Sequence, residues 1–212
     1  MPVITIRGQY GTWTADIGER IARKLNIDYV DQEIIAGVAK RLCRSGMSIK
    51  EKEMPPSTIL GRIAEAMSKT AYLGDDGYTG ISLPLWEIPL DDRNYLTGLE
   101  HVIKSLAENQ SIVIRGRGSQ FILKDSPGAF HVLIVASVEV RVKRVMERLK
   151  IHEEDAVKEI KRIDNGTRRF IKRYFDSKML DPIHYDIVIN THHLSTEDAA
   201  KIVVDAVSLL EI

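Results

Sequence analysis

Four short apolar runs along the chain have the pattern of buried β-strands. All four contain β-branched residues and are apolar on both faces, which is typical of central strands in a parallel sheet covered by helices. The runs are residues 3–6, 112–114, 131–135 and 187–189.

Between these runs, apolar positions recur with the spacing of amphipathic helices, and residues 195–198 have the spacing of a capping box before the last one. Alternating strands and helices predict an α/β fold with a three-layer, doubly wound parallel sheet, in which ligands bind at the carboxyl ends of the strands. The helical positions are Ile17, Ile21 and Leu25; Tyr95, Leu99, Val102 and Leu106; Val138, Val142, Val145 and Leu149; and Ile202, Val203, Ala206 and Leu210.

Two stretches interrupt this alternation. Residues 31 to about 110 have several helical patterns but no convincing strand, and residues 152–175 form one long helical pattern rich in Lys and Arg. We find neither an internal repeat nor an interdomain linker. Helical segments inserted into one α/β core therefore explain the pattern more simply than two domains.

Composition and charge narrow the class of protein. The 212 residues are 44% hydrophobic and 28% charged, and 30 basic residues balance 30 acidic ones. This balance argues against a surface dedicated to nucleic acid or to an anionic membrane. The single cysteine, Cys43, fits a reducing compartment. No apolar run approaches the ~20 residues that span a bilayer, and a strand begins at once without a leader pattern, so we expect a cytoplasmic protein.

The turn after the first strand, residues 7–18, lies where a phosphate-binding loop is expected. A strand leads there into a helix N-terminus, whose free N–H groups attract anions. However, counting from Gly8, the second glycine, the lysine and the hydroxyl of the standard loop are replaced by Trp13, Thr14 and Ala15. Trp is not expected to adopt positive φ as glycine does. The alternative is an ordinary turn that binds nothing.

Two arginines alternate with two glycines at the end of the second apolar run. Arg115 and Arg117 lie beside Gly116 and Gly118 at the predicted ligand-binding edge. Guanidinium groups bind phosphate through two hydrogen bonds, so this segment is a candidate anion site. A surface turn with solvated arginines is the alternative.

Residues 139–178 are strongly basic, with 13 Lys and Arg against 8 Asp and Glu. Lys161, Arg168 and Lys172 recur with helical spacing, and such a stripe repels itself unless an anion compensates it. The remainder of the chain is correspondingly acidic, which favours a small, enclosed anionic partner. A solvated helix face is the alternative. The adjacent His192 and His193 lack metal-site spacing and favour a solvated turn.

Several segments, taken in order, resemble the cytidylate kinase-like family, which is related to the P-loop nucleoside monophosphate kinases. They cover almost the whole chain, and their order and spacing are more specific than any single segment. The segments are Ile4-Thr5-Ile6 with Gln9-Tyr10-Gly11, residues 29–35, residues 112–118, residues 141–146, residues 163–175, and Asp181-Pro182 with residues 185–191.

The resemblance implies a single domain over residues 1–212 with three parts. These are a core at about 1–30, 111–150 and 181–212, a helical insert at about 31–110 that binds a nucleoside monophosphate, and a helical lid at about 151–180. The implied reaction transfers the γ-phosphoryl group of ATP, with Mg²⁺, to a nucleoside monophosphate-like acceptor. The implied partners are small-molecule nucleotides, with neither nucleic acid nor membrane, and a homodimer is an added hypothesis.

The resemblance also implies site residues. In the lid, Arg162, Arg168 and Arg169 would close over the phosphates, and Asp164 would orient them. The acceptor would be held by Asp31, Arg41 and Arg117. The donor phosphates would be cradled by Gly8, Gln9, Tyr10, Gly11, Thr12, Trp13 and Thr14. The metal ligands are not implied.

The chain departs from the family pattern in two places. The usual Gly-Ser-Gly-Gly loop appears as Gly11-Thr12-Trp13-Thr14 without the lysine of monophosphate kinases, and the Gly-Arg-Asp triplet appears as Gly116-Arg117-Gly118. Two functions therefore remain: an active phosphotransferase, or an inactive nucleotide-binding or regulatory module with a degraded loop.

Overall fold

The computed structural model describes residues 2–32, 35–37 and 92–209. Within them, five parallel strands form one sheet in the order β2-β3-β1-β4-β5. The four predicted strands are confirmed. The fifth strand, β2, was not predicted, because it is short and only one of its three residues is fully buried. The strands are β1 (Val3–Gly8), β2 (Asp28–Val30), β3 (Ile112–Arg115), β4 (Ala129–Val135) and β5 (Ile187–Asn190).

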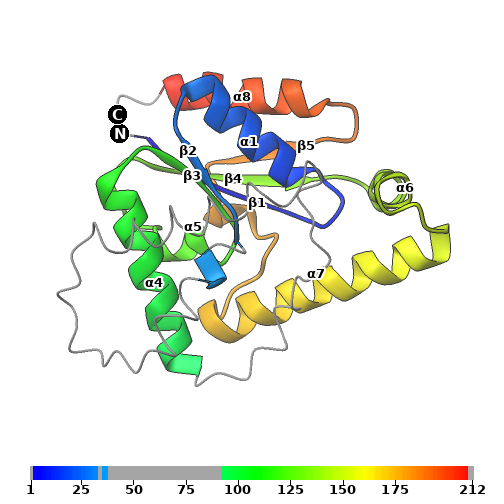
Figure 1. Cartoon of the computed structure of the whole chain (residues 1–212), viewed down its shortest axis with the longest axis horizontal. Coiled ribbons are helices and arrows are strands. Elements are labelled where there is room, and N and C mark those ends of the chain that lie inside the picture. Colours follow the sequence, from blue (N-terminus) through cyan, green and yellow to red (C-terminus); the bar gives the residue numbers. More distant parts are fainter. Residues whose placement is uncertain (1, 33–34, 38–91, 210–212) are drawn as a thin grey trace.

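Helices cover both faces of this sheet, as predicted for a three-layer α/β fold (Figure 1). One face carries α1 (Thr14–Leu25) and α8 (Thr196–Ser208), and the other carries α4 (Asp92–Asn109) and the short α5 (Ser119–Ile122). Beyond the carboxyl ends of the strands lies α6 (Val138–Leu149). From there α7 (Glu153–Phe175) runs back on the side of α4, followed by the 3₁₀ turn η1 (Pro182–His184).

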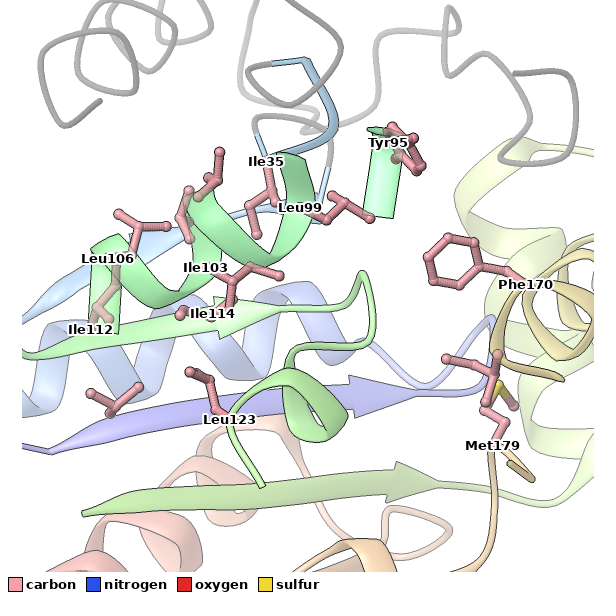
Figure 2. Packing of buried hydrophobic residues seen from close by; sticks show 14 residues of the cluster. Ile35, Tyr95, Leu99, Ile103, Leu106, Ile112, Ile114, Leu123, Phe170 and Met179 are labelled. Atoms are coloured by element: carbon pink, nitrogen blue, oxygen red, sulfur yellow. The ribbon is translucent and has the colours of Figure 1, made fainter. Parts of the chain in front are cut away.

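Successive strand residues enter two separate cores, because side chains alternate between the faces of a sheet. Val3 and Ile112 pack with Leu99 of α4 on one face, whereas Ile4 packs with Ile17 of α1 on the other. Figure 2 shows how α4 lies over β3 in the first core. Fully burying such an aliphatic side chain contributes about 1.5–3 kcal/mol to the stability of the fold. The two cores therefore fix the helices on the sheet.

Most of the predicted helical positions are buried, but some are not. In α8 the central Ile202 is 37% exposed, and Leu210 lies outside the described residues. In α6, Val142 and Val145 are buried against α7, but Val138 is 52% and Leu149 is 36% exposed. The reason is that α6 lies beyond the sheet and packs along its middle turns only. The capping box of α8 is present, with the Ser195 side chain accepting from the Asp198 backbone N–H.

The long basic pattern forms one continuous helix, α7, over 23 residues. Gly166 lies buried in its middle without interrupting it. Among the residues described, neither this helix nor any other is long and apolar enough to cross a bilayer.

Candidate functional site

A cleft of about 90 Å³ opens at the carboxyl ends of β1 and β3, at the edge where the sheet topology predicted a ligand site. Every residue from Gly8 to Thr14 contributes to its wall, so the seven residues predicted to cradle donor phosphates lie together. The remaining walls come mainly from β1, β3, α1, α6 and α7.

The first half of the loop is a tight turn packed against α6. Thr12 N–H donates to the Gln9 carbonyl across the turn, and Gly11 has φ of 85°, which an L-residue adopts only with strain. A Cβ added at Gly11 would lie 3.0 Å from the Arg141 carbonyl oxygen of α6. The glycine therefore allows the loop to approach this helix closely.

The expectation that Trp13 avoids positive φ is wrong. Trp13 has φ of 57° and ψ of 31° as the N-cap of α1. Its ring lies under the Arg144 guanidinium, with 4.0 Å between the guanidinium carbon and the ring centroid. A cation–π contact of this kind contributes about 0.5–2 kcal/mol, which is comparable to the cost of about 1–2 kcal/mol for a left-handed backbone.

Two hydroxyl groups fill the inside of the loop. Thr12 Oγ1 donates to the Gln9 carbonyl and lies 2.7 Å from Thr14 Oγ1, and both side chains are almost inaccessible. A Cβ added at Gly8 would lie only 1.9 Å from Thr14 Oγ1. The hydroxyls thus take the space above Gly8.

The N-terminus of α1 points its first-turn N–H groups toward this loop. No side chain in the described part of the chain caps it. Uncapped N–H groups at a helix N-terminus, aligned with the helix dipole, form a general anion site. This element retains the main physical feature of a phosphate-binding loop although the glycines and the lysine are missing.

Four arginines line the cleft: Arg7, Arg115, Arg144 and Arg148. No Asp or Glu lines it among the residues that the structure describes. The cleft is therefore electropositive, and its chemistry suits an anion with several negative charges.

Arg115 is oriented by Asp31 through a paired contact. Arg115 Nε lies 2.8 Å from Asp31 Oδ2, and Nη2 lies 2.8 Å from Oδ1 and 2.6 Å from Oδ2. Tyr29 also donates its hydroxyl to Asp31 Oδ2 at 3.2 Å. The predicted acceptor residue Asp31 thus lies beside the cleft but holds one of its arginines.

Arg144 joins α6 to the turn after β5. Its Nη1 donates to Thr191 Oγ1 at 3.0 Å and its Nη2 donates to the Thr191 carbonyl at 2.7 Å. Burial lowers the pKa of Arg144. With Trp13 on its face and Thr191 at its end, this guanidinium is fixed beside the loop.

The predicted acceptor residue Arg117 is buried but does not line the cleft. It lies between Gly116 and Gly118 in a run of three positive φ angles of 78°, 55° and 74°. Its Nε donates to the Gln32 carbonyl at 2.8 Å, which ties the turn after β3 to the segment after β2. Arg41, the other predicted acceptor residue, lies outside the described residues.

Asp164 does not contact the lid arginines through its carboxylate. Its Oδ1 accepts the Tyr10 backbone N–H at 3.0 Å, and its Oδ2 lies 2.7 Å from Arg141 Nη1. Arg141 Nη1 also donates to the Tyr10 carbonyl at 3.1 Å. The side chains of Asp164 and Arg141 are only 10% and 4% exposed, and together they fasten α6 and α7 to the loop.

The structure does not bring Arg162, Arg168 and Arg169 to the cleft. They line a separate open depression on α7 together with Asn165, whereas Ile163 and Thr167 face the cleft. Asn165 is two residues from both Ile163 and Thr167, which corresponds to a rotation of about 200° around the helix. It therefore lies on the side of α7 opposite the cleft. The catalytic role of Arg162, Arg168 and Arg169 remains a prediction.

Two of these three arginines have partners along α7. Arg162 Nε donates to Glu159 Oε2 at 2.7 Å, and Arg168 Nη2 donates to Asn165 Oδ1 at 2.7 Å. These contacts account for part of the basic stripe as an ordinary solvated helix face.

The described donor set does not fit a Mg²⁺ ion held by the protein. The hydroxyl position of the standard loop is Ala15, and the cleft wall that the structure describes has no carboxylate. The same residues contain no cluster of three metal-ligating side chains. Mg²⁺ prefers carboxylate and phosphate oxygens, so we assign no step to it.

Sequence reasoning did not select Arg7 or Arg148, and it assigned no specific role to Gln32, although all three line the cleft. One signal for Arg7 was available, because it directly precedes Gly8 at the carboxyl end of β1. Nothing local distinguishes Arg148, which comes from an exposed turn of α6.

The model of the cytidylate kinase-like family matches residues 3–193 of this chain. A cytidylate kinase from Sulfolobus acidocaldarius is 34% identical over 77 residues, which are 36% of this chain and 42% of that protein. A cytidylate kinase from Fervidobacterium nodosum is 27% identical over an alignment covering 96% of this chain and 95% of the relative.

Solved structures share the fold. An uncharacterised protein from Eubacterium ventriosum superposes with a TM-score of 0.71 at 20% identity, covering 99% of this chain and 100% of the other. A shikimate kinase from Bacteroides thetaiotaomicron superposes with a TM-score of 0.50 at 10% identity, covering 98% and 99%. At these identities the likeness concerns the fold alone. Since the family model spans most of its length, the chain belongs to the cytidylate kinase-like family.

Proposed function

We propose that this protein is a nucleotide kinase, which transfers the γ-phosphoryl group of ATP to a nucleoside monophosphate-like acceptor. The observation that carries the proposal is the convergence of four arginines and the uncapped N-terminus of α1 on one cleft. Phosphoryl transfer depends mainly on positioning and on electrostatic stabilisation of several negative charges. Family membership supports the same class, because the two curated relatives described above are cytidylate kinases.

The size of the cleft suggests which part of the ligands it holds. At about 90 Å³ it is smaller than the roughly 300–1,000 Å³ of a typical ligand pocket. Phosphate groups fit this space better than a whole nucleotide, so we place the donor phosphates against Gly8 to Thr14 and the base and ribose outside. The lid role of Arg162, Arg168 and Arg169 is part of this proposal, and it requires these side chains to reach the cleft, which they do not line in this structure.

An assay of ADP release with a panel of nucleoside monophosphates tests the proposal. We expect turnover above the acceptor-free background with at least one acceptor. Replacing Arg144 by Met should lower kcat/KM at least about tenfold, since it removes a charge-assisted contact from the cleft. Lys143→Met, an exposed neighbour on α6, is the matched control and should leave the rate unchanged.

An inactive nucleotide-binding module is the second candidate, and the interior of the loop favours it. The hydroxyls of Thr12 and Thr14 fill the space above Gly8, and the ring of Trp13 covers the Arg144 guanidinium. In this candidate the fold persists as a regulatory or binding protein. A nucleotide that raises the melting temperature without any ADP release would select it over the kinase.

Replacing Trp13 by Gly tests whether this loop is obstructed. Removal of the ring exposes Arg144 and relieves a left-handed backbone, so ATP affinity should rise at least about fivefold, equivalent to about 1 kcal/mol. Trp13→Phe retains an aromatic face and should stay near wild type. Isothermal titration measures both variants, and unchanged affinity in Trp13→Gly would show that the ring does not obstruct binding.

A further inference from the structure

Arg7 is a buried guanidinium without an acidic partner in the described chain. Only 7% of the residue is exposed, and it lines the cleft from the end of β1. Its Nη2 contacts the Met179 sulfur at 3.8 Å, which is a weak acceptor, and its Nε has no hydrogen-bond partner among the residues described. Such a group is costly to bury unless an anion compensates it.

The surroundings of Arg7 add to this cost. Burial, together with repulsion from Arg115 and Arg117, lowers the pKa of Arg7 to about 10. At neutral pH the side chain nevertheless remains charged, because its pKa stays well above 7. Three cationic side chains therefore meet at the ends of β1 and β3.

The nearby carboxylates are already engaged. Asp31 makes its paired contact with Arg115, and Asp164 holds Arg141 and the Tyr10 backbone N–H. Neither forms an ion pair with Arg7. No described carboxylate pairs directly with Arg7, and the cleft that Arg7 lines gives an external anion access to it.

Gly116 keeps this end of the cleft open. A Cβ added there would lie 2.9 Å from Gln32 Oε1 and 3.3 Å from Arg7 Nη1, and its φ of 78° favours glycine. Any larger residue would crowd the end of the Arg7 side chain. The glycine thus leaves space beside two guanidinium groups, those of Arg7 and Arg115.

We propose that Arg7 and Arg115 bind the phosphate group of a phosphate monoester between the ends of β1 and β3. A phosphate group carries about −1.5 to −2 at neutral pH, so it can compensate Arg7 and also contact Arg115, whose charge Asp31 already balances in part. The fork of an arginine also matches two phosphate oxygens. We assign this phosphate group to the acceptor of the kinase reaction, and that assignment rests on the proposed kinase function. The binding of a phosphate group by Arg7 and Arg115 does not depend on it.

Inorganic phosphate is the probe for this site, with chloride at equal ionic strength as the reference. We expect phosphate to raise the melting temperature of the wild-type protein. Arg7→Met should abolish that shift and weaken phosphate binding at least about tenfold by calorimetry. Without phosphate, its melting temperature should equal or exceed that of the wild type, because an uncompensated buried charge is gone. Arg23→Met, on the exposed side of α1, should behave as wild type.

Other outcomes overturn the inference. A wild-type protein that does not respond to phosphate, or an Arg7→Met variant that keeps the full shift, contradicts it. If Arg7→Met does not fold, Arg7→Lys tests the inference in its place. This variant should bind phosphate more weakly than the wild type, because an ammonium group lacks the planar fork of a guanidinium. Wild-type phosphate affinity in Arg7→Lys would contradict the inference.

The outcome for this site is separable from that of the kinase proposal. If Arg7 binds phosphate but no nucleoside monophosphate is turned over, the phosphate site is supported and the proposed kinase activity is contradicted. If Arg7→Met leaves turnover unchanged, the kinase activity stands and the assignment of this site to the acceptor phosphate is contradicted.

Discussion

Replacing Asp164 by Ala should lower the free energy of unfolding by about 3–5 kcal/mol. The substitution leaves the buried Arg141 guanidinium without its carboxylate partner, which lies 2.7 Å away in the wild type. It also removes the acceptor of the Tyr10 backbone N–H. Since 1 kcal/mol corresponds to about 2–4 °C in a domain of this size, the melting temperature should fall by roughly 6–20 °C.

Two further variants show whether this effect comes from the buried pair. Asp155→Ala removes an exposed carboxylate from the same helix, where it pairs with Lys158, and should cost less than about 0.5 kcal/mol. The double variant Arg141→Met/Asp164→Leu replaces the pair by apolar side chains and should recover most of the loss. Urea unfolding measures all three, and a cost below about 1 kcal/mol for Asp164→Ala would contradict the assigned anchoring role.

Replacing Gly118 by Ala should lower the free energy of unfolding by about 3 kcal/mol. Gly118 has φ of 74°, and a left-handed backbone costs an L-residue about 1–2 kcal/mol. The added Cβ would also lie 2.2 Å from Phe175 Cε2. Phe175 is stacked on Phe121 with 4.9 Å between ring centroids, so relieving this overlap disrupts an aromatic contact.

Gly37→Ala is the matched control, because the same substitution is expected to change the free energy of unfolding in the opposite direction at that position. Gly37 lies in helical backbone, and its added Cβ would meet no atom within 4 Å. Alanine is favoured over glycine in a helix by about 1 kcal/mol, so this variant should be neutral or more stable. Thermal and urea unfolding compare the two. Equal effects would mean that neither φ nor Phe175 restricts Gly118.

The contact with Phe175 also explains one departure from the family pattern. Where the family's triplet carries Asp, this chain has Gly118, and a side chain at that position would overlap Phe175. The sequence shows only that a carboxylate is missing. The reason depends on Phe175, at the end of α7, which lies 57 residues further along the chain.

Much of the fold was predictable because it depends on local periodicity. The β-branched runs identified four strands, and the apolar spacing identified α1, α4, α6, α7 and α8. β2 was missed because three residues, of which only Val30 is fully buried, carry little pattern. The exposed ends of α6, Val138 and Leu149, were misassigned because spacing does not show how far a helix extends past the sheet.

The candidate site was predictable only in part. The loop from Gly8 to Thr14 could be located, because a strand followed directly by a helix presents free N–H groups wherever it occurs. The prediction that Trp13 avoids positive φ failed, since a local steric rule did not include the stacking partner Arg144. That partner lies on another element.

By itself, the sequence determined the α/β class, the ligand-binding edge of the sheet and the basic character of residues 139–178, because each follows from periodicity or composition. Only the tertiary structure decided which cations face the cleft. The charge count indicated residues 139–178. Of these, Arg144 and Arg148 of α6 line the cleft, whereas Arg162, Arg168 and Arg169 of α7 face away from the loop. Arg7, a single arginine at the end of β1, lies buried beside Arg115 instead. The physical reason is that the cost of an uncompensated charge depends on its burial and on its neighbours in space, which one chain position does not reveal.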